Sequence, residues 1–425
     1  MSTMAAERQG FTVVTEVAQA GLPELRAQLA VIQRSPAANP IVPLACVATH
    51  FACLVILDRD CDRALGYPPL LVFDVAHDGH RRAYLDALVE ACGAGLRTIF
   101  RHAVDYPGDD ADLARYLRRK IVRASGAHLG YPGRSVRGVT QDAQLRRIVT
   151  TYLDSPRGRA MRASGPCAKD ARATILDVVR EARRKQPQLT TAPGAQQTRA
   201  GRFWRQVAGG PTGLVAVLAL LFLALTLRLR ERCDPREAYT PPVRPEPGTD
   251  EVNEDVQVQN HLTHLVSIRP GLRRALALRV ALYLVDKLSR VKFDQGDLGG
   301  IPTIHFARWV ILRGGRRPGR LLFLSNYDLS WDSYLGDFID RAHHGLTGVW
   351  SHTRGFPPTQ WIICEGARHE DAFKAWTRRH QLPEQVWYSS CPEQTVASVL
   401  ANAALRDGLE RDLDEAGARA WLTRL

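Results

Sequence analysis

The feature that most constrains the fold is an internal repeat, because two related copies of one unit should adopt the same structure. The segment THFACLVIL at 49–57 matches IHFARWVIL at 304–312 in six of nine positions. Residues 71–107 then align with 321–357 without a gap, and residues 131–146 align with 391–406. The blocks keep their order, so a duplication explains them.

The order of elements is clearest in the second copy. QNHLTHLVS alternates as a strand, residues 272–291 have the spacing of an amphipathic helix, and 304–312 with 319–327 predict a hairpin. A helix through WDSYLGDFIDRA and further short strands follow. Strand, helix, hairpin, helix and strand is the order of a ferredoxin-like, split βαβ unit. We therefore expect an α+β chain of two tandem ferredoxin-like repeats, which could pair through their apolar sheet faces as an α+β barrel.

An apolar segment, VAGGPTGLVAVLALLFLALTL, separates the copies and has 21 residues without a charge. This length covers a hydrocarbon core of roughly 30 Å, so it predicts a transmembrane helix, with a buried core helix as the alternative. Arginines flank it on both sides and do not fix its orientation. The predicted divisions are a first α+β repeat (1–155), a helical and polar linker (156–206), the transmembrane helix (207–227), a Pro-rich charged linker (228–254) and a second α+β repeat (255–425).

Composition and motifs exclude several classes of protein. Lys and Arg number 57 against 44 Asp and Glu, but the arginines are scattered, so nucleic acid is not an expected partner. The eight cysteines form no C-x-x-C pair, which argues against a zinc ribbon or a disulfide scaffold, and we predict no metal site. The chain also lacks the phosphate-binding, dinucleotide-binding, nucleophile-elbow and zincin motifs.

Retention between the copies selects the candidate functional residues. The histidine pairs are His50 with His305 and His102 with His352, and the acidic pair is Asp78 with Asp328. A histidine on an apolar strand can be a haem or metal ligand or a general base, but it can also be a core residue bonded to a backbone carbonyl.

Each aspartate follows a strand and precedes a helix, so it could cap that helix or act as a catalytic acid. Ser330 is an alternative cap for the helix of the second copy. Strict alternation of the strand 304–312 would place His305 with Ala307 and Trp309, and Arg308 on the opposite face. Arg308 is kept as a third catalytic candidate beside the two aspartates.

Two resemblances bear on function. The strings THLVSIRPG, GIPTIHFARWVIL, LLFLSNYD, YLGDFID, GLTGVWSHTRGFP and VWYSS resemble an uncharacterised family of bacterial proteins over about 256–409. In architecture, duplicated ferredoxin-like units are similar to the dimeric α+β barrels of dye-decolorising peroxidases and chlorite dismutases. That resemblance implies haem b bound by a histidine and a G-x-x-D-G loop with a distal aspartate, whereas this chain has VAHDG at 75–79 and SNYDL in the second copy.

Two functions remain open. The first is a membrane-anchored, non-catalytic binding or scaffold protein, and the second is a membrane-tethered haem protein with peroxidase-like redox chemistry and a cavity between the repeats. The expected partners are a lipid bilayer, an unidentified small ligand and, if the repeats lie on opposite sides of the membrane, a second copy of the chain. Glu7 and Arg8 interrupt any export signal, so we expect a single-pass protein of a bacterial inner membrane with its N-terminal half in the cytoplasm.

Overall fold

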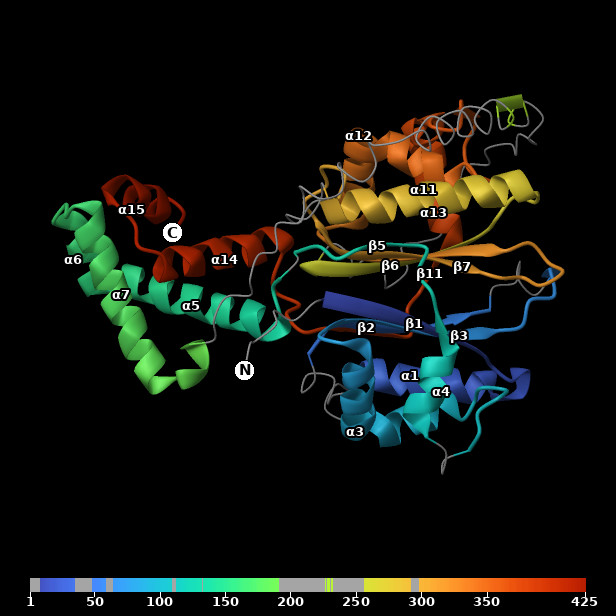
Figure 1. Cartoon of the computed structure of the whole chain (residues 1–425), viewed down its shortest axis with the longest axis horizontal. Helices are drawn as coiled ribbons and strands as arrows, with labels where there is room; N and C mark the ends of the chain where they lie inside the picture. Colours follow the sequence, from blue (N-terminus) through green and yellow to red (C-terminus); the bar gives the residue numbers. More distant parts are fainter. Residues whose placement is uncertain are drawn as a thin grey trace, which may run out of the picture.

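The computed structural model describes residues 8–34, 48–58, 64–108, 112–131, 133–190, 226, 228–229, 231, 256–291 and 298–425. Within these ranges the chain forms a mixed α+β structure with two antiparallel sheets of five strands. The sheets lie face to face, each carries helices on its outer side, and a separate group of helices projects from one end (Figure 1). The α+β prediction with two ferredoxin-like units is consistent with this arrangement.

The first repeat builds four strands of one sheet, in the order β2-β3-β1-β4. The hairpin β2–β3 and the central strand β1 give it the ferredoxin-like arrangement. Its elements are β1 (Arg8–Glu16), η1 (Gln19–Gly21), α1 (Leu22–Arg34), β2 (Thr49–Leu57), β3 (Leu70–Asp78), α3 (Arg81–Phe100), α4 (Leu113–Lys120) and β4 (Ile121–Val122).

The second repeat builds the equivalent strands in the order β11-β6-β8-β7. The predicted helix 272–291 and strand 304–312 are confirmed at these bounds, and the second hairpin strand, predicted at 319–327, is found at Arg320–Asp328. Its elements are β6 (Gln259–Ser267), α11 (Leu272–Val291), β7 (Ile304–Leu312), β8 (Arg320–Asp328), α12 (Trp331–Trp350), β9 (Thr359–Gln360), β10 (Cys364–Glu365), η5 (Gly366–Arg368), α13 (Glu370–His380) and β11 (Gln381–Leu382).

Each repeat also supplies the fifth strand of the other sheet. After β4, the chain crosses to the opposite sheet, where β5 (Gly126–His128) pairs with β7. After β11, it crosses in the reverse direction, and β12 (Val386–Ser389) pairs with β2. This exchange joins the repeats by backbone hydrogen bonds at an edge of each sheet.

The space between the sheets is filled by apolar side chains from both repeats. Val55 and Val72 of the first sheet belong to one buried cluster with Val310, Leu322 and Leu324 of the second. Separate clusters join each sheet to its own outer helices. Each sheet therefore covers the inner face of the other, so the chain itself supplies the partner that each apolar face requires.

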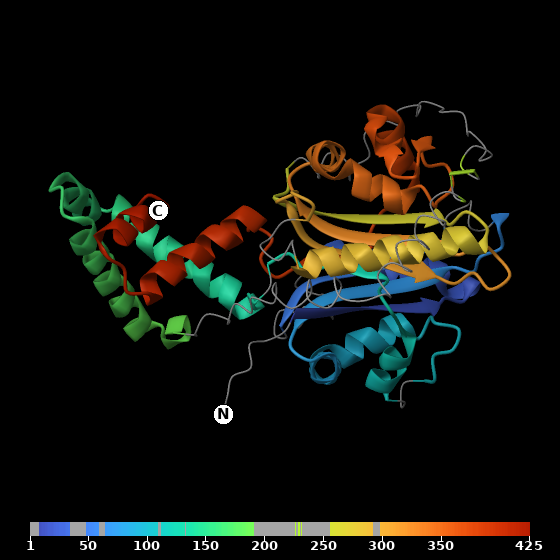
Figure 2. The same ribbon diagram turned by 45° about the horizontal axis from the view of Figure 1, so that its top comes forward.

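The projecting helices form an arm, defined here as α5 (Val136–Asp154), α6 (Pro156–Ala163), α7 (Ala168–Lys185), η4 (Pro187–Thr190), α14 (Val396–Glu410) and α15 (Glu415–Leu422). Figure 2 shows α5 and α14 leaving the sheets beside each other. Equivalent residues make the contacts in both directions. Arg146 on α5 bonds to Asn402 on α14, and Arg406 on α14 bonds to Asp142 on α5. The first part of the predicted linker, 156–190, folds as part of this arm.

The predicted transmembrane segment 207–227 lies outside the described residues, apart from Thr226. Among the helices in the described ranges, none is both long and apolar enough to cross a bilayer.

Candidate functional site

Four of the six retained residues lie where the sheets join the arm. His50 and His305 lie at the beginnings of β2 and β7, and Asp78 and Asp328 end the adjacent strands β3 and β8. The pairing of each hairpin shifts at the histidine, between Thr49 and Phe51 in one repeat and between Ile304 and Phe306 in the other. Such a bulge changes the direction of a side chain.

Strict alternation is therefore the wrong description of the start of β7. His305 contacts Phe51 of the opposite sheet, with 5.4 Å between the ring centroids, whereas Ala307 and Trp309 pack toward the outer helices.

In the first repeat, one carboxylate connects a histidine to the arm. His50 Nε2 lies 2.9 Å from Asp78 Oδ1, and both side chains are buried. The other oxygen, Asp78 Oδ2, accepts a hydrogen bond of 2.7 Å from the backbone N–H of Val136, the first residue of α5. We call this arrangement, of His50, Asp78 and the Val136 amide, the first latch.

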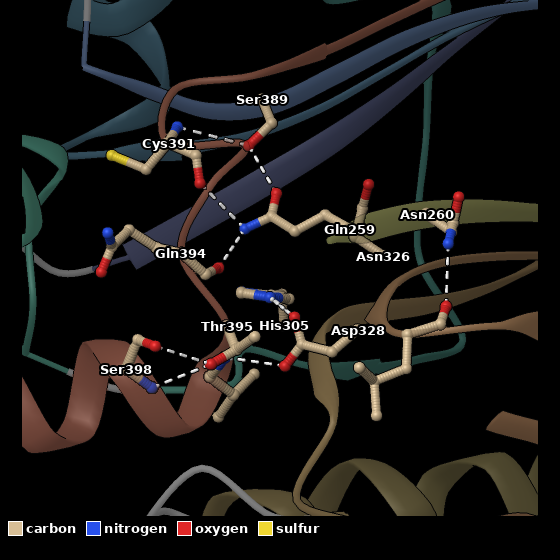
Figure 3. Close-up of polar contacts among 12 residues, drawn as sticks. Gln259, Asn260, His305, Asn326, Asp328, Ser389, Cys391, Gln394, Thr395 and Ser398 are labelled. Atoms are coloured by element: carbon tan, nitrogen blue, oxygen red, sulfur yellow. Dashed lines mark hydrogen bonds and ion pairs between the residues drawn. The ribbon is translucent and has the colours of Figure 1, made fainter. Parts of the chain in front are cut away.

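The second repeat has the same arrangement. His305 Nε2 lies 2.7 Å from Asp328 Oδ1, and Asp328 Oδ2 accepts a bond of 2.8 Å from the backbone N–H of Val396, the first residue of α14 (Figure 3). This is the second latch.

The aspartates do not cap the helices that follow them, because His80 and Ser330 occupy those cap positions, and the alternative prediction of Ser330 as the second cap is confirmed. The aspartates bind the N-termini of α5 and α14 instead, where the helix dipole also favours a negative charge.

Burial sets the protonation of the first latch. Burial, with the nearby charge of Arg8, lowers the pKa of His50 to about 4, so the imidazole is neutral at pH 7. Burial would raise the pKa of Asp78, but its bonds to His50 and Val136 and the charge of Arg8 lower it overall. The carboxylate is therefore ionised and can only accept, so His50 Nε2 carries the proton that it donates.

A tyrosine from the first repeat contacts the second latch. The hydroxyl of Tyr131 lies 3.1 Å from Nδ1 of His305. Gly130 precedes it with φ +51°, and a Cβ at this position would lie 2.1 Å from the carbonyl oxygen of His305, so only glycine allows this close approach. Both nitrogens of His305 are thus in hydrogen bonds, one from each repeat.

The two latches differ in the residue that begins the central strand. In the first repeat it is Arg8, opposite Asp78, and in the second it is Gln259, opposite Asp328. The side chain of Gln259 donates to the carbonyl oxygens of Cys391 and Gln394 and accepts a bond of 2.7 Å from Ser389 (Figure 3). Arg8 has no comparable bonds: its guanidinium lies 4.1 Å from the ring centroid of Tyr131.

Arg308, the third catalytic candidate, lies between the sheets and forms a buried ion pair with Asp74 of β3. Its Nη1 also donates to the carbonyl oxygens of Phe11 and Val75, and Thr12 donates to the same carboxylate at 2.6 Å. A Cβ at Gly10 would lie 1.7 Å from Nη2 of Arg308, so glycine makes room for the guanidinium. The pair fastens one sheet to the other.

His102 and His352 are equivalent to each other but lie far from the latches. The carbonyl oxygen of His102 accepts from the N–H of Ala18, and that of His352 accepts from the N–H of Arg269. Both contacts are just beyond the last residue of the central strand, whereas the latches lie at its first residue. A nine-residue strand separates the two ends by roughly 30 Å. The structure therefore does not bring these histidines together with His50 and His305.

The latch residues do not fit the haem site that the peroxidase resemblance implies. A haem iron needs an imidazole nitrogen that is free to bind it. Both nitrogens of His305 are engaged, and the ring of His50 is bonded to Asp78 and packed against Phe306. Each aspartate uses both of its oxygens, so neither is free as a distal acid.

Sequence reasoning missed Arg8, Tyr131, Gln259 and Asp74, because retention between the copies was the signal used. The equivalents of Arg8 and Tyr131 are Gln259 and Cys391, so these positions are not retained. A search for charged or aromatic residues that one copy has and the other lacks at the equivalent position would have selected them.

No protein-family model, curated protein or solved structure matches this chain.

Proposed function

We propose that this chain is a membrane-anchored, non-catalytic scaffold or binding protein, in which two ferredoxin-like repeats pair as one α+β barrel and hold the arm in a fixed position. The main support for the proposal is the hydrogen bonding of the two retained His–Asp pairs. Each retained His–Asp pair is buried and directs its second carboxylate oxygen to the first N–H of an arm helix.

This arrangement supports a mechanical role better than a catalytic one. General acid–base catalysis requires a group within hydrogen-bond reach of a substrate. The side chains of His50 and His305 are 2% and 0% exposed, and those of Asp78 and Asp328 are 5% and 3% exposed. A group so enclosed, with its hydrogen bonds directed to the protein, stabilises an arrangement of helices and strands.

The arm has the internal bonding expected of a rigid element. The buried carboxylate of Asp142 contacts Arg406 and lies 3.8 Å from Arg134, which also contacts Asp407 at 3.3 Å. Apolar residues of α5, α7, α14 and α15 form a common core around Trp421. The arm therefore presents a surface whose position relative to the sheets is set by both repeats.

The membrane anchor in this proposal is the apolar segment 207–227. Repeats that share two sheets have to lie on the same side of a bilayer. We therefore propose that this segment anchors the chain with both repeats on one side of the membrane, in place of the single crossing expected from the sequence. A second copy of the chain is not needed to cover the inner sheet faces.

The experiment is fractionation of membranes that contain the full chain. We expect the chain to resist extraction by alkaline carbonate. A variant with a Gly/Ser linker of equal length in place of 207–227 should be released, with the near-ultraviolet circular dichroism of its folded repeats unchanged. A control that scrambles the order of the same 21 residues should stay anchored, because its apolar content is the same. In sealed vesicles, protease should reach both repeats from one face. Extraction of the unaltered chain, or digestion of the repeats from opposite faces, would contradict the proposal.

A further inference from the structure

The strongest chemical difference between the repeats is at the first residue of the central strand. Arg8 and Gln259 occupy equivalent positions, each opposite the aspartate of its latch. Gln259 makes three hydrogen bonds with the chain that leads to α14. Arg8 is 4% exposed, yet its Nε, Nη1 and Nη2 atoms are buried without a hydrogen-bond partner among the residues that the structure describes.

Aromatic rings pack against the guanidinium of Arg8, but they do not accept hydrogen bonds from its N–H groups. The guanidinium carbon lies 4.1 Å from the centroid of the Tyr131 ring and 5.7 Å from that of Phe306. These contacts stabilise a cation through the ring faces, but they do not accept its N–H bonds in the plane of the guanidinium. Asp78 is the nearest carboxylate that acts on its charge, and both oxygens of Asp78 are used by the first latch.

A buried guanidinium in this condition requires an acceptor. Leaving a charged donor without a partner in the interior costs several kcal/mol, by the order of magnitude of ion desolvation. Loss of the proton does not remove the problem: burial lowers the pKa of Arg8 only to about 10, so the group stays cationic at pH 7. In the second repeat the equivalent residue is a neutral amide, Gln259, whose hydrogen bonds are all made within the protein.

We propose that Arg8 is the anchor of a buried anion site, in which a small oxyanion accepts the hydrogen bonds of the guanidinium beside Tyr131. The chemistry is that of a carboxylate or phosphate group, whose paired oxygens match the fork of an arginine. A small ligand is required because Arg8 and Tyr131 are each less than 5% exposed. This inference stands apart from the scaffold proposal, since it concerns one repeat only and does not require a membrane.

The test uses thermal unfolding and titration calorimetry of the full chain with sodium phosphate, sodium acetate and sodium chloride at equal ionic strength. We expect phosphate or acetate to raise Tm beyond the effect of chloride, as binding to the folded state requires. The anion that gives the larger rise in Tm identifies whether the site prefers a phosphate or a carboxylate group.

The matched variant is Arg8→Gln, which copies the residue of the second repeat. We expect it to fold, to show at least a ten-fold weaker affinity for the oxyanion and to respond to phosphate and acetate only as it does to chloride. Arg8→Lys keeps the charge but loses the fork, and should bind with intermediate affinity. Arg137→Gln removes an exposed arginine at the start of α5 and should leave the response unchanged.

Three results would overturn the proposal. The first is a wild-type chain that responds to neither oxyanion beyond chloride. The second is an equal response in folded Arg8→Gln or, if that variant does not fold, in folded Arg8→Lys. The third is loss of the response in Arg137→Gln, which would assign it to general surface charge.

Discussion

The two repeats agree in the contacts that hold the arm and differ in the polar residues between the sheets. Both have a buried His–Asp pair bonded to the first N–H of an arm helix. Both also stack an aromatic ring of the second hairpin strand on a tyrosine, His77 of β3 on Tyr84 at 4.0 Å and Tyr327 of β8 on Tyr334 at 3.9 Å. Within the described residues, the first repeat places a guanidinium without a hydrogen-bond partner beside its latch, and the second does not. The two repeats therefore share the attachment of the arm, while the interior of the first carries a charge that the second lacks.

Among equivalent contacts of the two repeats, those in the arm should differ most in their contribution to the free energy of unfolding. Asp142→Ala should lower the free energy of unfolding by about 3–5 kcal/mol, because it removes the carboxylate from Arg406, which is 2% exposed. Asn402→Ala, at the equivalent position of α14, should cost about 1 kcal/mol because it removes a bond between an arginine and a neutral amide. Urea unfolding measures both, and equal losses would contradict the asymmetry.

The two stacked ring pairs should differ in how their contribution to stability depends on pH, because only the first contains a histidine. Burial lowers the pKa of His77 to about 4 in the folded chain, against 6.5 when unfolded. The unfolded chain therefore takes up this proton first, and stability present above pH 6.5 is lost as pH falls toward 4, by about 3 kcal/mol for this one group. His77→Tyr copies the second repeat and should flatten the pH dependence of unfolding by that amount. An unchanged slope would show that His77 does not contribute.

Each latch should act on its own arm helix. Asp78→Asn and Asp328→Asn should each lower the free energy of unfolding by about 2 kcal/mol, because each weakens bonds to a charged acceptor. Hydrogen exchange should become faster in the first turn of α5 for Asp78→Asn and in the first turn of α14 for Asp328→Asn. A variant that changes neither helix, or both equally, would contradict the assignment of one latch to each helix.

The smallest effect is expected at the start of the second central strand. Gln259→Ala removes the amide that bonds to Ser389, Cys391 and Gln394, and should cost about 1 kcal/mol. In anion-free buffer, Arg8→Gln should cost nothing or stabilise the chain, because it removes a buried charge without a partner. Chemical unfolding of the two variants side by side measures the difference, and a larger loss for Arg8→Gln would show that Arg8 is satisfied within the protein.

Sequence patterns predicted elements well where local periodicity decides them. The bounds of α11 and β7 follow from apolar spacing and turn residues, β8 lies one residue from its predicted bounds, and the repeat located the same elements in the first half. The direction of His305 could not be predicted, because a bulge depends on the pairing of two strands. The exchange of β5 and β12 and the bonds from Asp78 and Asp328 to α5 and α14 join residues far apart in the chain, which periodicity does not report.

The central claim is that the two repeats form one body by exchanging edge strands. A protease site placed in the Pro-rich linker 228–254 would allow the purified full chain to be cut between the repeats, followed by size-exclusion chromatography under native conditions. The account predicts that the two fragments migrate together as one particle with the circular dichroism spectrum of the uncut chain. Separation into two fragments that remain folded would contradict it.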